Sequence, residues 1–209
     1  MRTVLCIIQP IIFHPISPSL SYYFSSSLLS NPLSPFPHQY FYWMFESRSE
    51  PSTDPFILWM TGGPGCSGQL ALLNENGPCS VAKDGSGNLA TVTNPYSWTN
   101  KATVLWIDQP TGVGFSYGDS GDYDHDEAGI RDDMYHFLLE FFAENPEYAK
   151  LPFYVFGESY GGHFAPNVAY RVWEGNNNAT KSGNGADVIN LQGLAVGNGL
   201  TDPSIQYQW

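Results

Sequence analysis

A serine turn bounded by glycines restricts the fold of this chain more than any other feature. The apolar run Phe153 to Phe156 leads directly into Gly157-Glu158-Ser159-Tyr160-Gly161-Gly162, and residues able to begin a helix follow. In a G-x-S-x-G turn between a strand and a helix, a strained backbone holds the serine clear of the sheet. Side chains at Gly157 and Gly161 would collide where strand and helix approach each other. The pattern therefore predicts a nucleophile elbow with Ser159 at its tip.

Short apolar runs and helical patterns alternate from Gln39 onward, which is typical of a mostly parallel α/β sheet with flanking helices. Besides the run before Ser159, we expect four strands: Tyr40 to Phe45, Phe56 to Met60, Thr103 to Ile107 and Leu191 to Val196. The third of these is β-branched and apolar enough to lie centrally. Five apolar residues at helical spacing before Pro146 predict a helix packed on the sheet: Ile130, Met134, Phe137, Leu138 and Phe141.

The charge of the chain argues against one class of partner. Its 209 residues include 8 Lys and Arg against 20 Asp and Glu, a net charge of −12, which matches nucleic-acid phosphate poorly. We therefore expect no nucleic-acid partner.

Acidic residues crowd the segment from Asp119 to Asp133, where seven acids occur with only Arg131 among them. We interpret this segment as a solvated face with negative charge at a helix N-terminus. A calcium loop is the alternative, although the EF-hand spacing with its central Gly and terminal Glu is missing.

Residues 1–38 differ from the rest in composition, since Arg2 is their one charged side chain and Ser and Pro are frequent. Met1 to Ile8 is similar to the basic start and apolar core of a secretory leader, but Pro10 and further prolines interrupt it. We interpret residues 1–38 as a candidate signal peptide, or as a disordered tail or an error in the gene model. Residues 39–209 should form the folded part. No window is long and apolar enough to predict a membrane span.

Cysteine usage predicts neither a metal site nor a redox pair. The chain has three cysteines, Cys6, Cys66 and Cys79, so at least one lacks a partner within it. Their spacing matches neither a zinc site nor a CxxC motif, and we interpret them as buried thiols or disulfide halves.

A glycosylation sequon is present at Asn178-Ala179-Thr180. It lies in the polar stretch Gly175 to Gly185, which we expect to be an exposed loop. Asn178 is the candidate glycosylated residue.

A second glycine-rich segment, Thr61-Gly62-Gly63-Pro64-Gly65-Cys66-Ser67, follows the expected strand that ends at Met60. Such a loop lets backbone N–H groups approach a ligand closely, and a glycine-rich loop ahead of an elbow can form part of an oxyanion hole. The N–H groups of Gly63 and Tyr160 are the candidate donors.

These motifs, together with others in the same order along the chain, resemble the serine carboxypeptidase family. The resemblance covers about residues 39 to 209. It rests on Phe41-Tyr42-Trp43 with Phe45-Glu46-Ser47-Arg48, Gly62-Gly63-Pro64-Gly65-Cys66-Ser67, Asn76-Gly77-Pro78, Asn94-Pro95-Tyr96-Ser97-Trp98, Asp108-Gln109-Pro110, Gly112-Val113-Gly114-Phe115-Ser116-Tyr117, Gly157 to Gly162, and Gly197-Asn198-Gly199-Leu200-Thr201-Asp202-Pro203.

The resemblance implies roles for particular residues. Ser159 would be the nucleophile, with Gly63 and Tyr160 as oxyanion donors. A pocket for the substrate's C-terminal carboxylate would include Glu158, Thr61 and Gly62, with Glu158 protonated at acidic pH. The family usually has Asn where Thr61 stands, and Thr can donate one hydrogen bond but lacks the reach of an amide.

The resemblance also implies an incomplete α/β-hydrolase fold, the N-terminal half of the domain. The triad of this fold runs Ser, Asp, His along the chain, but after Ser159 only His163, Asp187 and Asp202 are available, and none fits. The family's Asp and His, and the disulfide partner of Cys66, would come from sequence after Trp209. Without an imidazole beside Ser159, we expect this chain to be inactive alone.

We therefore expect a serine carboxypeptidase that releases C-terminal residues of peptides and proteins through an acyl-enzyme at acidic pH. No cofactor is expected. Vacuolar, lysosomal or secreted localisation follows from the family, the candidate leader and the sequon together. Two alternatives stay open: an acyltransferase on the same scaffold, and a non-catalytic truncated pseudoenzyme. The sequence does not indicate an oligomeric state.

Overall fold

The computed structural model describes residues 39–182, 185 and 188–208. The expected leader in residues 1–38, with Cys6, lies outside the described residues, as does Asp187. The centre of the fold is a five-stranded sheet in the order β1-β5-β2-β6-β7. Its strands are β1 (Tyr42–Phe45), β2 (Phe56–Met60), β5 (Thr103–Ile107), β6 (Phe153–Glu158) and β7 (Leu191–Gly197). Only β1 is antiparallel to its neighbour β5, and the other pairs are parallel.

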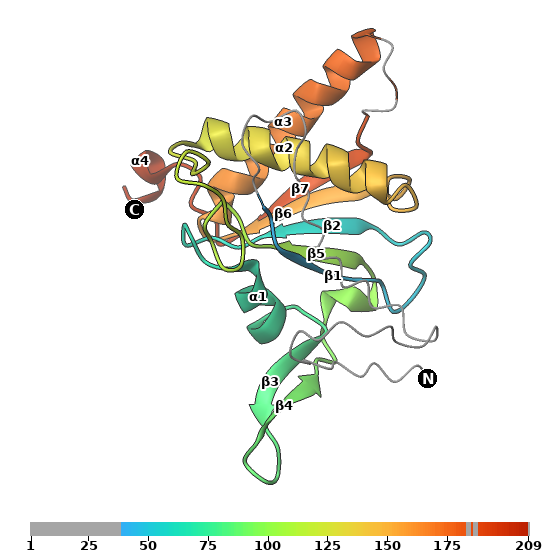
Figure 1. The fold of residues 1–209 in the computed structure, drawn as a ribbon, viewed down its shortest axis with the longest axis vertical. Helices are drawn as coiled ribbons and strands as arrows, with labels where there is room; N and C mark the ends of the chain where they lie inside the picture. Colours follow the sequence, from blue (N-terminus) through green and yellow to red (C-terminus); the bar gives the residue numbers. More distant parts are fainter. Residues whose placement is uncertain (1–38, 183–184, 186–187, 209) are drawn as a thin grey trace.

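Apolar layers cover the sheet on both faces. The helices α2 (Glu127–Glu144) and α3 (Gly161–Ser182) pack on one face, and α1 (Gly68–Asn74) lies on the other (Figure 1). Every residue of β2 and β5 is buried, as expected of strands between two layers. Successive side chains of a strand point into apolar clusters on opposite faces of the sheet. Phe56 and Leu58 pack in the cluster beneath α2 and α3, whereas Ile57 and Trp106 pack with Leu72 of α1.

Most of the elements expected from the sequence are confirmed. β2 and β5 have the predicted bounds, β1 begins at Tyr42 instead of Tyr40, and β6 and β7 extend slightly further than predicted. All five residues chosen for their helical spacing are buried on α2, which ends before Pro146. The sequence patterns did not predict the shorter elements. These are the hairpin of β3 (Cys79–Lys83) and β4 (Leu89–Thr93), the helix α1, the 3₁₀ turn η1 (Trp98–Asn100) and the short helix α4 (Pro203–Gln206).

The expectation of an exposed loop over Gly175 to Gly185 is wrong, because α3 continues to Ser182. Tertiary contacts override the weak helix propensity of this segment. Gly175 packs against the Tyr135 ring, where a side chain would collide. The amide of Asn176 donates to the Ile189 carbonyl and accepts from the Ile189 N–H, at 2.7 and 2.9 Å. Asn178 is exposed, but on the helix surface.

The acidic segment before α2 is only partly the solvated face that we expected. Asp126 is the N-cap of α2 and accepts from the Gly129 N–H at 2.9 Å, which places negative charge at the helix N-terminus as predicted. Asp122, however, is buried. Burial and the nearby charge of Asp133, with smaller contributions from Asp126 and Glu127, raise the pKa of Asp124 to about 7.

We expect the free energy of unfolding to fall as the pH rises from 3.8 to about 7, because native Asp124 keeps its proton there and the unfolded chain does not. Asp124→Asn keeps the shape without the ionisation, so its stability should decline less over this window and exceed that of the wild type above about pH 7. Urea unfolding at a series of pH values measures both. Asp119→Asn, which removes an exposed carboxyl group of the same segment, is the matched control. A wild-type slope in Asp124→Asn would contradict this account.

Candidate active site

The turn between β6 and α3 has the geometry of a nucleophile elbow. Ser159 is exposed and has a φ of +59°, a left-handed conformation that is costly for a residue with a side chain. Its backbone N–H donates to the Gly197 carbonyl at 3.0 Å. Its carbonyl accepts from the N–H groups of Gly162 and Leu200, at 3.0 and 2.8 Å. These bonds hold the strained residue in place.

The glycines around Ser159 are there for steric reasons. A β-carbon on Gly157 would collide with the Gly161 carbonyl, and one on Gly161 would lie 2.6 Å from the carbonyl oxygen of Met60. The collision expected where strand and helix approach is therefore present in the structure.

The glycine-rich loop, residues 61–67, connects β2 to α1 and packs directly on the elbow. A β-carbon on Gly62 would overlap the Tyr160 nitrogen and would lie 2.6 Å from the Glu158 carbonyl oxygen. Gly63 follows with a φ of +115°, which L side chains rarely adopt. The structure thus brings the backbone of this loop beside Ser159 and beside the amide of Tyr160, the other candidate oxyanion donor.

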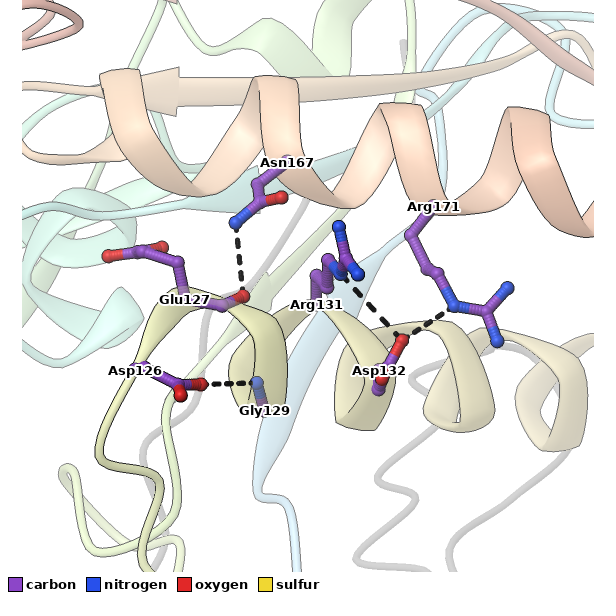
Figure 2. Close-up of polar contacts among 7 residues, drawn as sticks. All are labelled: Asp126, Glu127, Gly129, Arg131, Asp132, Asn167 and Arg171. Carbon is purple, nitrogen blue, oxygen red and sulfur yellow. Dashed lines mark hydrogen bonds and ion pairs between the residues drawn. The ribbon is translucent and has the colours of Figure 1, made fainter.

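Tyr160 is held from both helices on its side of the sheet. Its hydroxyl donates to Glu127 Oε1 at 3.2 Å, and its ring packs on those of His163 and Phe164. Burial and the charge of Glu127 raise the pKa of the Tyr160 phenol. Glu127 is itself fixed, because its carbonyl accepts from the Asn167 side chain at 3.0 Å (Figure 2).

Further along the same helix pair, α2 and α3 are joined by an ion pair. The Arg171 Nε lies 2.6 Å from Asp132 Oδ1 (Figure 2). The Arg171 guanidinium also stacks over the Tyr135 ring, 4.0 Å from its centroid. These contacts tie α3, which begins at the elbow, to α2.

A second carboxyl group, Glu75, accompanies Glu158 and was missed at the sequence level. Partial desolvation and the negative charge of Glu158 raise the pKa of Glu75. Glu75 is the C-cap of α1, immediately before the Asn76-Gly77-Pro78 motif, and that position was the available signal. Glu75 therefore keeps its proton to higher pH than an ordinary glutamate, and a protonated carboxyl group can donate a hydrogen bond to a carboxylate.

Thr61 is buried at the start of the glycine-rich loop. Its hydroxyl accepts from the indole Nε1 of Trp59 at 3.1 Å, which leaves the hydroxyl proton for another acceptor.

Other candidate residues lie as follows. The His163 ring packs on Tyr160 at 4.6 Å between centroids, and Asp202 caps α4 by accepting from Ser204 and Ile205. Within the described ranges, no His or Asp forms a hydrogen bond with the Ser159 hydroxyl. Cys66 is free and exposed. In the part of the chain that the structure describes, no group of three His, Cys, Asp or Glu could hold a metal ion, and no helix could cross a membrane.

Comparison with known proteins now assigns the chain to a family. The family model described as serine carboxypeptidase matches residues 35–209. The chain belongs to the serine carboxypeptidase family. Its α/β fold, with a mostly parallel central sheet and flanking helices, is that of the α/β-hydrolases, as expected.

Individual relatives agree with this family. A serine carboxypeptidase-like protein of Oryza sativa subsp. japonica is 50% identical over 170 residues, which are 80% of this chain and 38% of that protein. A serine carboxypeptidase S10 family member of Dictyostelium discoideum is 48% identical over 168 residues, with the same two shares. Kex1(delta)p, a prohormone-processing carboxypeptidase from Saccharomyces cerevisiae, superposes with a TM-score of 0.70 at 33% identity, covering 86% of this chain and 37% of that one. The chain thus spans less than half the length of these relatives.

We predict that Gly62→Ala destabilises the protein by about 2 kcal/mol, because its methyl group would force the glycine-rich loop away from the elbow. Gly197→Ala is the matched control: Gly197 also contacts the elbow, but nothing lies within 4 Å of its added β-carbon. The control should stay within about 1 kcal/mol of the wild type. Urea unfolding of both variants measures the difference in stability. Equal effects would show that the close packing at Gly62 does not contribute to the free energy of unfolding.

Proposed function

We propose that this chain supplies the nucleophile, the oxyanion donors and the carboxylate pocket of a serine-type carboxypeptidase. The enzyme would release C-terminal amino acids from peptides and proteins through an acyl-enzyme at acidic pH. One observation carries the proposal: Ser159 is held exposed at a positive φ with the backbone of Gly62 packed against it. This chemistry requires no cofactor, whatever the oligomeric state of the protein.

The mechanism assigns each group a step. The Ser159 oxygen forms a bond to the scissile carbonyl carbon, and the backbone N–H groups of Gly63 and Tyr160 donate to the oxygen that becomes negatively charged. The C–N bond then breaks, the leaving amine takes the proton that came from Ser159, and water later hydrolyses the acyl-enzyme. We propose that the imidazole that carries this proton comes from outside the described residues.

Glu158 and Glu75 are proposed to recognise the C-terminal carboxylate of the substrate. A protonated carboxyl group can donate a hydrogen bond to a carboxylate, whereas an ionised one repels it. The raised pKa of Glu75 supports this role, because its proton persists to higher pH beside Glu158. Gly62 and the free proton of the Thr61 hydroxyl would complete the pocket. Such pH dependence suits an acidic compartment, and vacuolar, lysosomal or secreted localisation is proposed accordingly.

Thr61 favours one alternative activity. Its hydroxyl reaches less far than an amide and is already bonded to Trp59, which weakens carboxylate recognition at this position. An acyltransferase that passes the acyl group from an activated ester to an alcohol would need the same nucleophile and oxyanion donors. A non-catalytic pseudoenzyme is the outcome if the wild-type gene product shows neither hydrolysis nor acyl transfer.

Two modifications are also proposed. The exposed sequon residue Asn178 is proposed to carry a glycan, and Cys66 to be half of a disulfide.

The first test is Ser159→Ala in the full gene product that carries this sequence. Release of the C-terminal amino acid from an N-blocked dipeptide at acidic pH should fall by a factor of about a million, because the nucleophile is lost. Ester-to-alcohol transfer measured on the same samples separates the acyltransferase. The 209-residue chain alone should show no turnover. Undiminished hydrolysis by Ser159→Ala would exclude the proposed mechanism.

A second test concerns pH. As the pH rises, Glu75 loses its proton and repels the substrate carboxylate, so KM should rise while kcat changes less. Glu75→Gln keeps a donor that does not ionise and should flatten this rise in KM. The same peptide with a C-terminal amide is the control, since it carries no carboxylate to repel. A KM profile unchanged by Glu75→Gln would remove Glu75 from the pocket.

A further inference from the structure

Asp108 is a fully buried carboxyl group beside the glycine-rich loop that the proposed mechanism does not use. It directly follows β5 and has a relative exposure of 0%. Its Oδ1 accepts from the Ser67 hydroxyl at 2.5 Å and from Gln69 Nε2 at 3.4 Å, and its Oδ2 accepts from the Phe115 N–H at 2.9 Å. Both oxygens of the Asp108 side chain thus accept hydrogen bonds from neighbouring groups.

No cation within the described ranges compensates this burial. Among the residues that the structure describes, ion pairs join Asp132 to Arg131 and Arg171, and none involves Asp108. Burying a polar carboxyl group costs free energy unless its hydrogen bonds are made, so a fully buried one calls for a specific reason. The surrounding backbone is shaped to accept it, because a β-carbon on Gly114, which has a φ of +59°, would overlap the carboxyl group.

The partner that Asp108 holds is the end of the glycine-rich loop. Ser67 is the N-cap of α1, where its oxygen accepts from the Gln69 N–H at 3.1 Å while its proton goes to Asp108. The other end of the loop is fixed at Thr61, whose hydroxyl is bonded to Trp59.

Between these two ends the loop is held by the packing of the Gly62 backbone on the elbow. Gly62, Gly63 and Gly65 carry no side chains that could fix the loop further, and the Cys66 N–H to Gly62 carbonyl bond, at 3.2 Å, spans them. The position of the Gly63 N–H therefore depends on where Ser67 is anchored.

We propose that Asp108 is a positioning residue that fixes the glycine-rich loop through the Ser67 hydroxyl, so that the Gly63 N–H is aligned with that of Tyr160. This inference rests on the proposed function of Ser159. Oxyanion donors stabilise the transition state only within a narrow range of distances, so a small displacement of the Gly63 N–H lowers the rate of reaction. Substrate binding should change less, because the pocket residues Thr61 and Gly62 are held separately, by Trp59 and by the elbow.

Hydrogen exchange tests the anchoring without any need for activity. Ser67→Ala removes the hydroxyl, and Asp108→Asn leaves one carbonyl that can serve Ser67 or Phe115 but not both. In each variant the amides of residues 62–66 should exchange at least about tenfold faster. Ser67→Thr, which keeps a hydroxyl, should restore protection.

Ser116→Ala is the matched control. Ser116 is buried, and its hydroxyl donates to the Asp108 main-chain carbonyl at 2.6 Å, so this variant leaves the hydrogen bonds of the Asp108 carboxyl group intact. Its loop should exchange as in the wild type. Unchanged exchange in Ser67→Ala, or equal acceleration in Ser116→Ala, would overturn the anchoring whatever the protein catalyses.

Kinetics test the consequence for catalysis. In the full gene product, Ser67→Ala and Asp108→Asn should lower kcat by about tenfold with little change in KM, less than the loss of an entire oxyanion donor. The rate ratio of an ester to its thionoester, whose sulfur accepts hydrogen bonds poorly, should fall in both variants and recover in Ser67→Thr. An unchanged kcat, or a lower kcat with an unchanged ratio, would overturn the positioning role.

The two proposals fail in different ways. If Ser159→Ala is as active as the wild type, or the wild type hydrolyses neither ester nor peptide, the proposed function fails. The exchange experiment then still decides whether Asp108 anchors the loop.

Discussion

The contact between the backbone of Gly62 and the turn at Ser159 is the constraint on which the rest of this structure depends. β2 and β6 are parallel neighbours, with Met60 opposite Gly157, so the segments that follow them leave the sheet at the same edge. Their backbones can touch only because no side chain intervenes at Gly62 or Gly161. This close contact between the two backbones depends on the sheet order, on the two flanking layers and on the anchoring of both loops.

Local patterns in the sequence were sufficient to predict most of the sheet and the elbow. Strands such as Phe56–Met60 are uninterrupted apolar runs, and the elbow carries its steric requirement in its glycines. The end of α3 could not be predicted in this way. Its polar, glycine-containing sequence favours a loop, and it is helical because Gly175 meets Tyr135 and Asn176 bonds to Ile189. Those partners are distant in sequence, so no local pattern indicates them.

The same limit applies to the candidate site. Ser159, Gly63 and Tyr160 follow from motifs, because the role of each depends on its immediate neighbours. The contacts of Glu75 and Asp108 follow from the fold: partial burial and the charge of Glu158 on another element raise the pKa of Glu75, and Asp108 gains its partners from loops on both sides of it. Pairing of charges and anchoring of loops are tertiary properties, which explains why the motifs predict Ser159 as the nucleophile but do not predict the groups around it.

The acidic composition acquires a physical meaning from these pairs. In three pairs of acidic side chains, a neighbouring negative charge adds to the effect of burial. Glu158 raises the pKa of Glu75, Asp133 raises the pKa of Asp124, and Glu144 raises the pKa of Glu140. In each pair, protonation relieves repulsion between like charges. A chain with 20 acids and 8 bases therefore has less internal repulsion in an acidic medium, where a protonated Glu75 is also proposed to donate a hydrogen bond to a carboxylate ligand. Stability and the proposed recognition of C-termini thus depend on pH in the same direction and for the same electrostatic reason.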